Sequence, residues 1–463
     1  MIVFRKNENI IELIAFPNEH VKKGEYLLIE DENTSLVVQV IDVSYVDSLG
    51  ILEDLIRESI FKSFNHVEFD TTNAGYLTKA VRDMKIVTTV IRGSINNNSY
   101  TPTYDELPSR VAARVREISA ANLLKLCRNG FGHYASIGYD LNGNEVYIDI
   151  GKLDGSLTLI TGMKGTGKSH LAKLLISNLI NYNVPILVFD LNGEYYGLLE
   201  IDSVRVLEPG KNLFFSLSYL GRETVLNLLV HILGLPGLSA NLFKNIWLNT
   251  VKTFKKVTIK SLIKMIDANV KNLMIKDALI SRLMILGSAR FIVDDDERNL
   301  YIETLFDEYK CNIVSLKTIS PLERKLLVEA FLSKLSRLLE ERVLKPLFLV
   351  AEEAHMYVRE TYWEDIITRM RHYGLYILFV TNQPNALNQT VFRQLDNVFV
   401  FKFQNEYDIE MVSKISNIDV RTVKSVVKDL KVGRALVIGP IVEWLPIVMD
   451  FKPLPFKAMG ETR

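Results

Sequence analysis

The chain has 463 residues and a mass of 52.9 kDa, and its 55 Lys and Arg residues balance 55 Asp and Glu residues, so its formal net charge is zero. With 48% hydrophobic and 24% charged residues, it has neither the low hydrophobicity nor the high net charge of a disordered protein. Neutrality also argues against a protein that coats nucleic acid through a bulk basic excess. The length predicts roughly two to three domains.

The two cysteines, Cys127 and Cys311, lie far apart in the sequence, which argues against a disulfide framework and a zinc site of ordinary spacing. The first residues mix charged with apolar side chains and so lack the uninterrupted apolar region of a signal peptide. No stretch reaches the roughly 18 consecutive apolar residues of a membrane span. We therefore expect a soluble cytoplasmic protein in a reducing compartment, with no membrane partner.

The first part of the chain is predicted to be β structure. Short runs rich in Val, Ile and Tyr, separated by turn-type residues, cover residues 10–16, 25–30, 36–45 and 85–92. Such spacing is typical of a small barrel or sandwich, and we expect this domain at residues 1–95. The polar stretch 92–109 is predicted to be unstructured and to mark a domain boundary. A helix is expected over 110–127, so residues 96–130 are expected to form a linker and helix.

Further along, short apolar runs alternate with helical patterns. The predicted strands cover residues 157–161, 186–190, 312–316, 347–351, 375–380 and 398–403. Continuous apolar runs are expected of parallel strands that are buried on both faces. Ser320 and Glu323 form a predicted capping box at the start of a helix. The pattern indicates an α/β fold with an open, mostly parallel sheet over residues 131–455, a helical insertion at about 220–290 and a tail at 456–463.

A phosphate-binding loop follows the strand predicted at 157–161. The loop reads GMKGTGKS and satisfies the pattern G-x-x-x-x-G-K-[ST] between a strand and a helix. Its backbone N–H groups and the helix N-terminus would face the phosphates, with Lys168 at the β- and γ-phosphates and Ser169 as a Mg²⁺ ligand. Lys164 is either a second cation at the phosphates or a solvated lysine. We expect ATP and Mg²⁺ as cofactors, and the predicted nucleotide-binding residues are Gly162, Met163, Lys164, Gly165, Thr166, Gly167, Lys168, Ser169 and His170.

Two adjacent carboxylates, Glu352 and Glu353, follow the strand predicted at 347–351. Buried strands rarely end in paired charges without a cation nearby. In a phosphate-loop ATPase, the first acid of such a pair binds the Mg²⁺ shell and the second polarises the attacking water. We expect Glu352 and Glu353 to take these roles in that order. His355 is expected to be a packed, hydrogen-bonding residue rather than a catalytic one.

Polar residues also surround the strand predicted at 375–380. The polar block Thr381, Asn382, Gln383 and Pro384 follows it. A polar side chain here could contact the γ-phosphate or the lytic water, or the block could only form a helix cap and a turn before Pro384. Arg369 and Arg371 precede it. An arginine here could reach the nucleotide of a neighbouring subunit as a finger, or it could offset a helix dipole. Both interpretations remain open.

Together these motifs resemble the HerA-type DNA translocases of the FtsK–HerA superfamily, along nearly the whole chain. The most specific blocks are ILVFDLNGEYYG, with Asp190, Gly193 and Glu194 at the recurring positions, and LFLVAEEAH at 347–355. The resemblance implies a RecA-like P-loop ATPase core behind a small N-terminal β-barrel, assembled as a homo-hexameric ring. It further implies ATP-driven movement of double-stranded DNA through the pore, and a NurA-type nuclease partner in DNA-end processing and repair.

The resemblance also implies site roles at matching positions. Lys168 and Ser169 would hold nucleotide and Mg²⁺, Glu352 and Glu353 would be the Mg²⁺-shell acid and the base, and Arg371 would be the finger. The family's usual sensor block Ser-Gln-Arg-Pro is Thr-Asn-Gln-Pro at 381–384 here. The polar sensor would therefore be Asn382, with Gln383 as the alternative.

These departures leave more than one function open. The first is a DNA translocase in repair, and the second is a viral or plasmid packaging or conjugation ATPase of the same superfamily. A third function, of another class, is a nucleotide-gated ring platform without motor activity. Glu353 favours the two motor functions, because a protein that only binds nucleotide does not need a water-activating base.

Two clusters of basic residues are candidate contacts for DNA phosphates. Contacts to phosphates release counterions and need no base recognition, as a sequence-neutral motor requires. The alternative is an ordinary solvated helix surface. The first cluster comprises Lys252, Lys255, Lys256, Lys260, Lys264, Lys271 and Lys276, and the second comprises Lys424, Lys428, Lys431 and Arg434.

Overall fold

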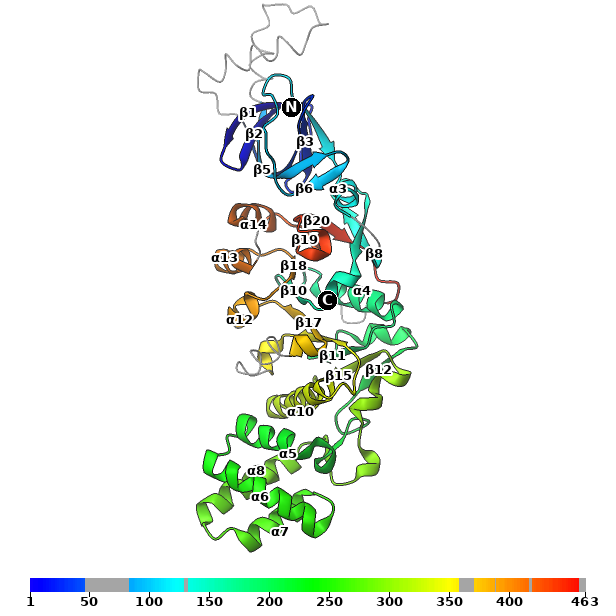
Figure 1. The fold of residues 1–463 in the computed structure, drawn as a ribbon, viewed down its shortest axis with the longest axis vertical. Coiled ribbons are helices and arrows are strands. Elements are labelled where there is room, and N and C mark those ends of the chain that lie inside the picture. The colour runs from blue at the N-terminus through cyan, green and yellow to red at the C-terminus, as the bar shows by residue number, and fades with distance from the viewer. Residues whose placement is uncertain (46–82, 129–131, 358–369, 388, 416–418, 458–463) are drawn as a thin grey trace, which may run out of the picture. The chain divides into compact units, whose positions relative to one another are not determined.

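The computed structural model (Figure 1) describes residues 1–45, 83–128, 132–357, 370–387, 389–415 and 419–457. The chain forms two compact units. The first unit comprises Met1–Gly151 and Phe399–Lys452, and the second comprises Lys152–Val398 and Pro453–Arg463. This division differs from the expected domains, because the segment after residue 398 packs with the N-terminal part of the chain. The chain returns to the first unit within strand β18 (Asn397–Val400).

An antiparallel sheet of seven strands forms the N-terminal part of the first unit. The strand order is β1-β2-β5-β4-β3-β7, and β6 pairs with β5. Alternate side chains of these strands are fully buried, among them Leu13, Leu27 and Val38. An N-terminal sheet is thus present, while its closure into a barrel stays a prediction. The strands are β1 (Ile2–Asn7), β2 (Ile10–Ala15), β3 (Tyr26–Glu30), β4 (Ser35–Tyr45), β5 (Lys85–Asn96), β6 (Ser99–Thr101) and β7 (Arg114–Ile118).

Two expectations for this region are wrong. Residues 92–101 are not unstructured, because β5 continues to Asn96 and turns into β6 through Asn97 and Asn98, both of which have positive φ. Residues 114–118 are not helical. They form strand β7, whose backbone pairs antiparallel with β3 along its whole length. The helix α3 (Ala120–Cys127) begins only after Ser119, whose side chain caps it.

The C-terminal segment of the first unit is tied to this sheet by specific hydrogen bonds. The Pro446 carbonyl accepts from Gln39 Nε2 at 2.7 Å and from the Tyr26 hydroxyl at 2.9 Å. Arg92 on β5 pairs with Asp419, the N-cap of α14, at 3.0 Å. The remaining elements of the unit are the antiparallel strands β8 (Tyr134–Asp140), β9 (Glu145–Asp149), β19 (Arg434–Ile438) and β20 (Ile447–Phe451), and the helices α13 (Glu406–Ile415) and α14 (Val420–Val427).

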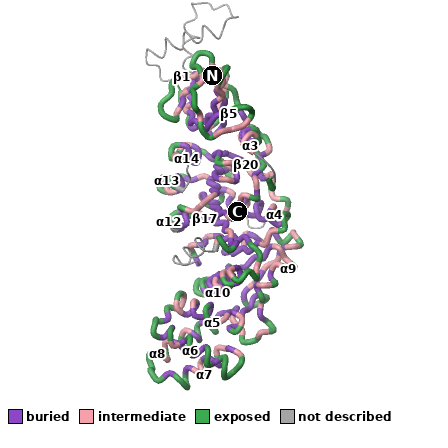
Figure 2. The backbone as a smooth tube through the Cα atoms, viewed as in Figure 1, coloured by how far each residue is buried: buried purple, intermediate pink, exposed green. Residues whose placement is uncertain are grey.

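The second unit contains a parallel sheet with the strand order β12-β15-β11-β16-β17-β10. The central strands are apolar and buried along their length, as Figure 2 shows. The predicted α/β fold is therefore confirmed. Strand β12 was not predicted from the sequence. The strands are β10 (Leu157–Thr161), β11 (Ile186–Asp190), β12 (Val204–Leu207), β15 (Cys311–Ser315), β16 (Leu347–Glu352) and β17 (Leu375–Thr381).

The helices of the second unit connect these strands. The predicted capping box is present, because the Ser320 side chain accepts from the Glu323 N–H and Glu323 accepts from the Ser320 N–H. Residues 217–287 are mostly helical, and their status as an insertion stays a prediction. No helix of the described residues is long and apolar enough to cross a membrane. The helices are α4 (Lys168–Asn181), α5 (Leu217–Asn227), α6 (Gly237–Phe254), α7 (Ile259–Asn269), α8 (Leu273–Gly287), α9 (Leu305–Glu308), α10 (Pro321–Glu340) and α12 (Gln389–Phe392), and the short strands β13 (Phe215–Ser216) and β14 (Ile292–Val293) flank α5 to α8.

Candidate nucleotide site

The parallel sheet brings the predicted site residues to one edge. Strand β10 leads into the phosphate loop, β17 ends at Thr381, β16 ends at Glu352, and β11 ends at Asp190. In the register, Thr161 lies opposite Thr381, and Glu352 lies opposite Val380. The carboxyl ends of neighbouring parallel strands meet at the same edge, which is where open α/β sheets bind their ligands. The sheet thus gathers motifs that are more than 200 residues apart in the sequence.

The phosphate loop is curled by glycines and closed by its own side chains. A positive φ, which glycine adopts at little cost, occurs at Gly162, Gly165 and Gly167. Gly167 is also the N-cap of α4. Thr166 Oγ1 and Lys168 Nζ both donate to the Met163 carbonyl, at 2.7 and 2.9 Å. A charged phosphate is a stronger acceptor for Lys168 than this neutral carbonyl.

Lys168 lies among carboxylates. Burial lowers its pKa, and the negative charges of Glu353, Glu194 and Glu352 act in the opposite direction. Lys173 of α4 donates to the Glu194 carbonyl at 3.1 Å, which joins this helix to the loop after β11. The loop lysine and both predicted acids therefore share one site.

Glu352 and Asp190 form a buried acidic pair. Glu352 is 3% exposed and accepts from the Leu191 N–H at 3.1 Å. Burial, together with the charges of Asp190 and Glu194, raises the pKa of Glu352 to about 8. Asp190 is fully buried, and burial raises its pKa, although it accepts backbone N–H groups from residues 193–195. Two like charges in such a site require a proton or a cation between them.

The residues at this edge fit a nucleotide-bound Mg²⁺. This ion prefers oxygen ligands and is usually held by one or two carboxylates together with phosphates. Glu352 supplies a carboxylate, and Ser169 supplies a hydroxyl at the start of α4. Thr161 Oγ1 is buried at the end of β10 and has no hydrogen-bond partner within the described ranges. Those ranges contain no group of three or more His, Cys, Asp or Glu residues that could hold a metal ion.

Hydrogen bonds of its backbone and its carboxylate hold Glu353 at the end of β17. Its backbone is in the left-handed region, with φ 46° and ψ 46°, and its N–H donates to the Val380 carbonyl at 2.7 Å. Its carboxylate accepts from Thr381 Oγ1 at 2.7 Å and from the Asn382 N–H at 3.1 Å. His355 Nδ1 lies 3.6 Å from the same carboxylate. A non-glycine residue keeps this backbone conformation only where its surroundings enforce it.

The sensor block differs in detail from the expectation. Asn382 meets Glu353 through its backbone N–H, and Gln383 is exposed, with its backbone N–H donating to Thr381 Oγ1 at 3.1 Å. The side chain that bonds to Glu353 is that of Thr381, which belongs to the predicted polar block but was not predicted to contact the acid. Thr381 is the last residue of β17 and lies opposite Thr161, which directly precedes the phosphate loop. Sensor roles for Asn382 and Gln383 stay predictions.

Arg371 does not join this site within one chain. Its guanidinium donates to the Gly155 carbonyl and lies 3.0 Å from Asp396, whose carboxylate also accepts the Leu157 N–H at 2.9 Å. These contacts lie at the amino ends of β10 and β17, whereas the phosphate loop follows the carboxyl end of β10. A finger role in a neighbouring subunit stays a prediction. Arg369 lies outside the described residues.

Two tyrosines are buried near the acidic pair. Tyr195 follows the loop after β11, and Tyr357 follows the short helix that begins after Glu353. Their hydroxyls have no hydrogen-bond partner among the residues that the structure describes. Burial, with a further contribution from the charge of Glu352, raises the pKa of both tyrosines. Both tyrosines are therefore neutral and add no charge to the site.

The predicted DNA contacts are partly ion-paired. In the first cluster, Lys256 pairs with Asp296 at 3.1 Å and Lys276 pairs with Asp267 at 2.8 Å. The exposed lysines of that cluster lie on or beside α6 and α7, and they are Lys252, Lys255, Lys260, Lys264 and Lys271. In the second cluster, Lys428 pairs with Glu406 and Arg434 pairs with Asp450. The first cluster therefore presents more exposed lysines than the second.

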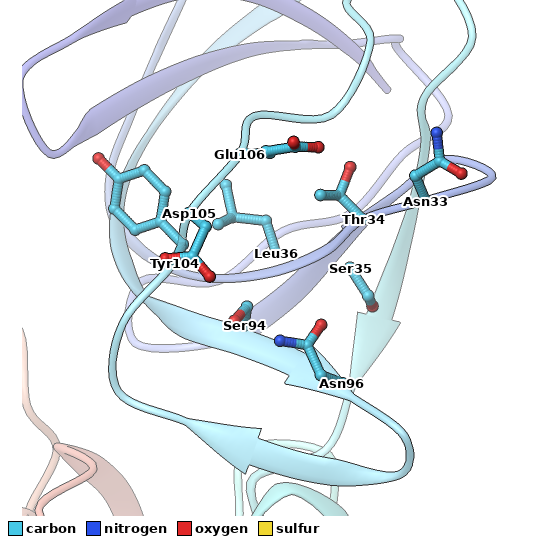
Figure 3. A pocket seen from close by; sticks show the side chains of 9 residues that line it. All are labelled: Asn33, Thr34, Ser35, Leu36, Ser94, Asn96, Tyr104, Asp105 and Glu106. Atoms are coloured by element: carbon cyan, nitrogen blue, oxygen red, sulfur yellow. The ribbon is translucent and has the colours of Figure 1, made fainter.

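A cavity of about 220 Å³ lies on the N-terminal sheet of the first unit (Figure 3). It is lined by Asn33, Thr34, Ser35, Leu36, Ser94, Asn96, Tyr104, Asp105 and Glu106. The lining contains two acids and no lysine or arginine, so it does not suit a phosphate. The candidate nucleotide site therefore stays at the edge of the parallel sheet.

Comparisons with known proteins agree with this arrangement of a phosphate loop and strand-end acids. Residues 135–335 match the family model of the central domain of the helicase HerA. A probable helicase of Methanocaldococcus jannaschii is 22% identical, and the match covers 95% of this chain and 88% of that protein. The DNA double-strand break repair helicase HerA of Sulfurisphaera tokodaii is 23% identical over 70% of this chain and 69% of that protein. The predicted resemblance to HerA-type proteins is thus confirmed.

Solved structures show the same α/β fold. VirB4 of Thermoanaerobacter pseudethanolicus superposes with a TM-score of 0.56 at 16% identity, over 71% of this chain and 98% of that one. The plasmid coupling protein TrwB in complex with ADP and Mg²⁺ superposes with a TM-score of 0.51 at 14% identity, over 74% of this chain and 94% of that one. At these identities the likeness concerns the fold.

Proposed function

We propose that this protein is an ATPase that uses ATP and Mg²⁺ to move double-stranded DNA. The observation that carries the proposal is the placement of Lys168, Glu352 and Glu353 at one edge of the parallel sheet. A protein that only binds nucleotide needs the lysine and the loop, but it does not need a second, precisely held carboxylate. The site is therefore built for hydrolysis.

Each residue has a defined task in this proposal. The phosphate loop and the N-terminus of α4 bind the phosphates, and Lys168 offsets their charge. Ser169 and Glu352 would hold Mg²⁺, which supplies charge neutralisation at the β- and γ-phosphates when it is bound. Glu353 orients the attacking water and accepts its proton, because its carboxylate is held at a fixed place by β17.

The DNA substrate, the ring and the partner belong to the same proposal. The relatives named above as helicases support a DNA substrate, and the exposed lysines beside α6 and α7 offer phosphate contacts. We propose a homo-hexameric ring that encircles the duplex and acts with a NurA-type nuclease in DNA-end processing. Light scattering with ATP and Mg²⁺ tests the ring, and a monomer under these conditions would contradict it.

The deciding experiment is the ATPase rate with and without double-stranded DNA. We expect stimulation by DNA in the wild type. Lys168→Ala should abolish nucleotide binding, whereas Glu353→Gln should still bind ATP with a kcat reduced roughly 100-fold or more. Glu117→Gln, which makes the same change at an exposed position on β7, is the matched control and should leave the rate unchanged. Unchanged turnover in Glu353→Gln would refute hydrolysis at this site, and hydrolysis without DNA stimulation would favour a nucleotide-gated platform.

A further inference from the structure

We infer that Thr381 is a positioning residue for the general base, and that it acts through Glu353 rather than through the nucleotide. The inference rests on the proposed ATPase function. The sequence motifs place Thr381 only within a polar block near the nucleotide and assign the sensor role to Asn382 or Gln383. Three groups surround the hydroxyl of Thr381: the Glu353 carboxylate, the Gln383 N–H and the Gln383 carbonyl.

The position of Thr381 is rigidly determined. It is the last residue of β17, it is 1% exposed, and its strand is hydrogen-bonded on both sides, to β10 and to β16. Its β-branched side chain has restricted rotation about χ1. The hydroxyl is therefore held in place by the sheet and not by the loop that follows it.

The hydroxyl proton of Thr381 is directed at Glu353. Thr381 Oγ1 accepts the Gln383 N–H at 3.1 Å and lies 2.7 Å from Glu353 Oε2, while its other neighbouring acceptor, the Gln383 carbonyl, is 3.5 Å away. A hydroxyl has one proton, and the short contact to a charged oxygen is the stronger bond. The Gln383 amide occupies the acceptor side of this hydroxyl and so leaves its proton for the carboxylate.

Both oxygens of the Glu353 carboxylate are bound, but only one of these bonds comes from a side chain. Oε1 accepts the Asn382 backbone N–H at 3.1 Å, and the Glu353 backbone N–H donates to the Val380 carbonyl at 2.7 Å. These backbone bonds would survive a change of side chain at position 381. Removing the Thr381 hydroxyl would therefore take the hydrogen bond from Oε2 alone, leave His355 Nδ1 at 3.6 Å as its nearest other polar neighbour, and let the carboxylate rotate away from its orientation.

The first test is a kinetic cycle with Thr381→Val, which keeps the shape of the side chain and removes the hydroxyl. We expect kcat to fall about 10-fold, the effect of one hydrogen bond to a charged group, while the KM for ATP changes less than about twofold. Thr381→Ser, which restores a hydroxyl, should recover most of the loss. In the Glu353→Gln background, Thr381→Val should cause no further loss.

Three results would overturn the inference. An equal fold-loss in the wild-type and Glu353→Gln backgrounds would mean that Thr381 acts independently of Glu353, for instance on the nucleotide. A raised KM with an unchanged kcat would assign Thr381 to binding. An unchanged or increased kcat in Thr381→Val would show that the bond to Glu353 does not help catalysis.

A second measurement separates this inference from the proposed function. The contact between Thr381 and Glu353 contributes to stability whether or not the protein hydrolyses ATP, so the shifts in thermal midpoint of Thr381→Val and Glu353→Gln should be non-additive. A wild type without ATPase activity but with non-additive midpoints would refute the proposed function and leave the contact in place. If the shifts in thermal midpoint of the two variants add up in the double variant, the contact between Thr381 and Glu353 is refuted, even in an active enzyme.

Discussion

The carboxylates at the strand ends carry a stability cost as well as a proposed function. Asp190 and Glu352 are almost completely buried, and burial opposes the ionised form of both, while the charge of Asp190 further raises the pKa of Glu352. The three backbone N–H groups that Asp190 accepts hold the loop of residues 193–195 in place. For these two residues, ionisation of the buried carboxylates is unfavourable, and a bound cation would offset this cost.

Glu352→Gln is expected to stabilise the metal-free protein, and more so at higher pH. Because the pKa of Glu352 is raised from 4.5 to about 8, the folded protein retains a proton that the unfolded chain releases above about pH 4.5. The contribution of Glu352 to stability is therefore full below about pH 4.5 and is lost as the pH rises towards about 8. Glutamine cannot ionise, so the gain should reach the order of a few kcal/mol at the high end.

Chemical unfolding in the absence of Mg²⁺, at about pH 5 and about pH 8, measures this difference. Glu117→Gln on the exposed face of β7 is the matched control and should show no comparable pH dependence. The same stability difference between Glu352→Gln and the wild type at both pH values would contradict the prediction.

At the scale of elements, the two edges of the parallel sheet differ in kind. The carboxyl edge gathers the phosphate loop and the acids, whereas the amino edge is held by a clamp made of Arg371, Asp396 and the first residues of β10. Arg371 and Asp396 are about one-third and one-quarter exposed. The clamp joins the turn before β17 to the segment before β18, which are separate in the sequence.

Arg371→Ala and Asp396→Asn are each expected to lower the free energy of unfolding by about 1–2 kcal/mol, and the double variant should lose little more than either single one. The reason is that both variants break the same contact. Chemical unfolding of the three variants measures the coupling. The Arg337–Glu341 pair on α10, whose side chains are about half exposed, is the control and should contribute about 0.5 kcal/mol or less.

If the double variant loses as much free energy of unfolding as Arg371→Ala and Asp396→Asn lose together, the two residues do not form a shared clamp. ATPase rates give the complementary result. If Arg371→Ala lowers kcat while Asp396→Asn does not, the arginine acts at a nucleotide of another subunit and the finger prediction gains support.

At the scale of the whole molecule, a net charge of zero is compatible with a protein that encircles DNA. A ring needs positive charge only where the duplex passes, and its other surfaces can balance the total. The exposed lysines beside α6 and α7 concentrate charge locally, while many cations elsewhere are paired, such as Lys428 with Glu406 and Arg434 with Asp450. Neutrality therefore excludes coating by bulk charge and leaves local phosphate contacts.

Lys260→Glu combined with Lys264→Glu is expected to weaken duplex binding and to reduce the DNA stimulation of the ATPase. Both lysines are exposed and lie one turn apart on α7, so each can approach a phosphate. The affinity should fall at least about 10-fold, and the slope of log affinity against log salt should decrease by roughly one to two. Fluorescence anisotropy at several salt concentrations measures both.

Lys325→Glu combined with Lys345→Glu is the matched control, since it makes the same change of charge at exposed positions elsewhere in the second unit. It should leave the affinity and the salt slope close to those of the wild type. Equal effects of the two double variants would mean that only the total charge matters, and that α7 is not a specific contact surface.

Patterns along the chain predicted the parallel sheet, the phosphate loop and the strand-end acids Glu352 and Glu353. These features are local, because continuous apolar runs, a glycine pattern and charges at a strand end can be read within a few residues. Predictions from the sequence were less accurate where local signals for strand, turn and helix compete. The polar stretch before residue 101 joins the sheet through an Asn-Asn turn, and β7 forms because β3 offers it an unpaired edge.

Which side chains contact one another depends on the three-dimensional fold. Thr381 bonds to Glu353 because β16 and β17 are parallel neighbours in one register, and Arg371 lies at the opposite edge because it precedes the strand whose carboxyl end carries the site. Asp190 and Glu352 acquire their raised pKa values only when the sheet buries them together. Burial and proximity are properties of the fold, so no pattern along the chain contains them.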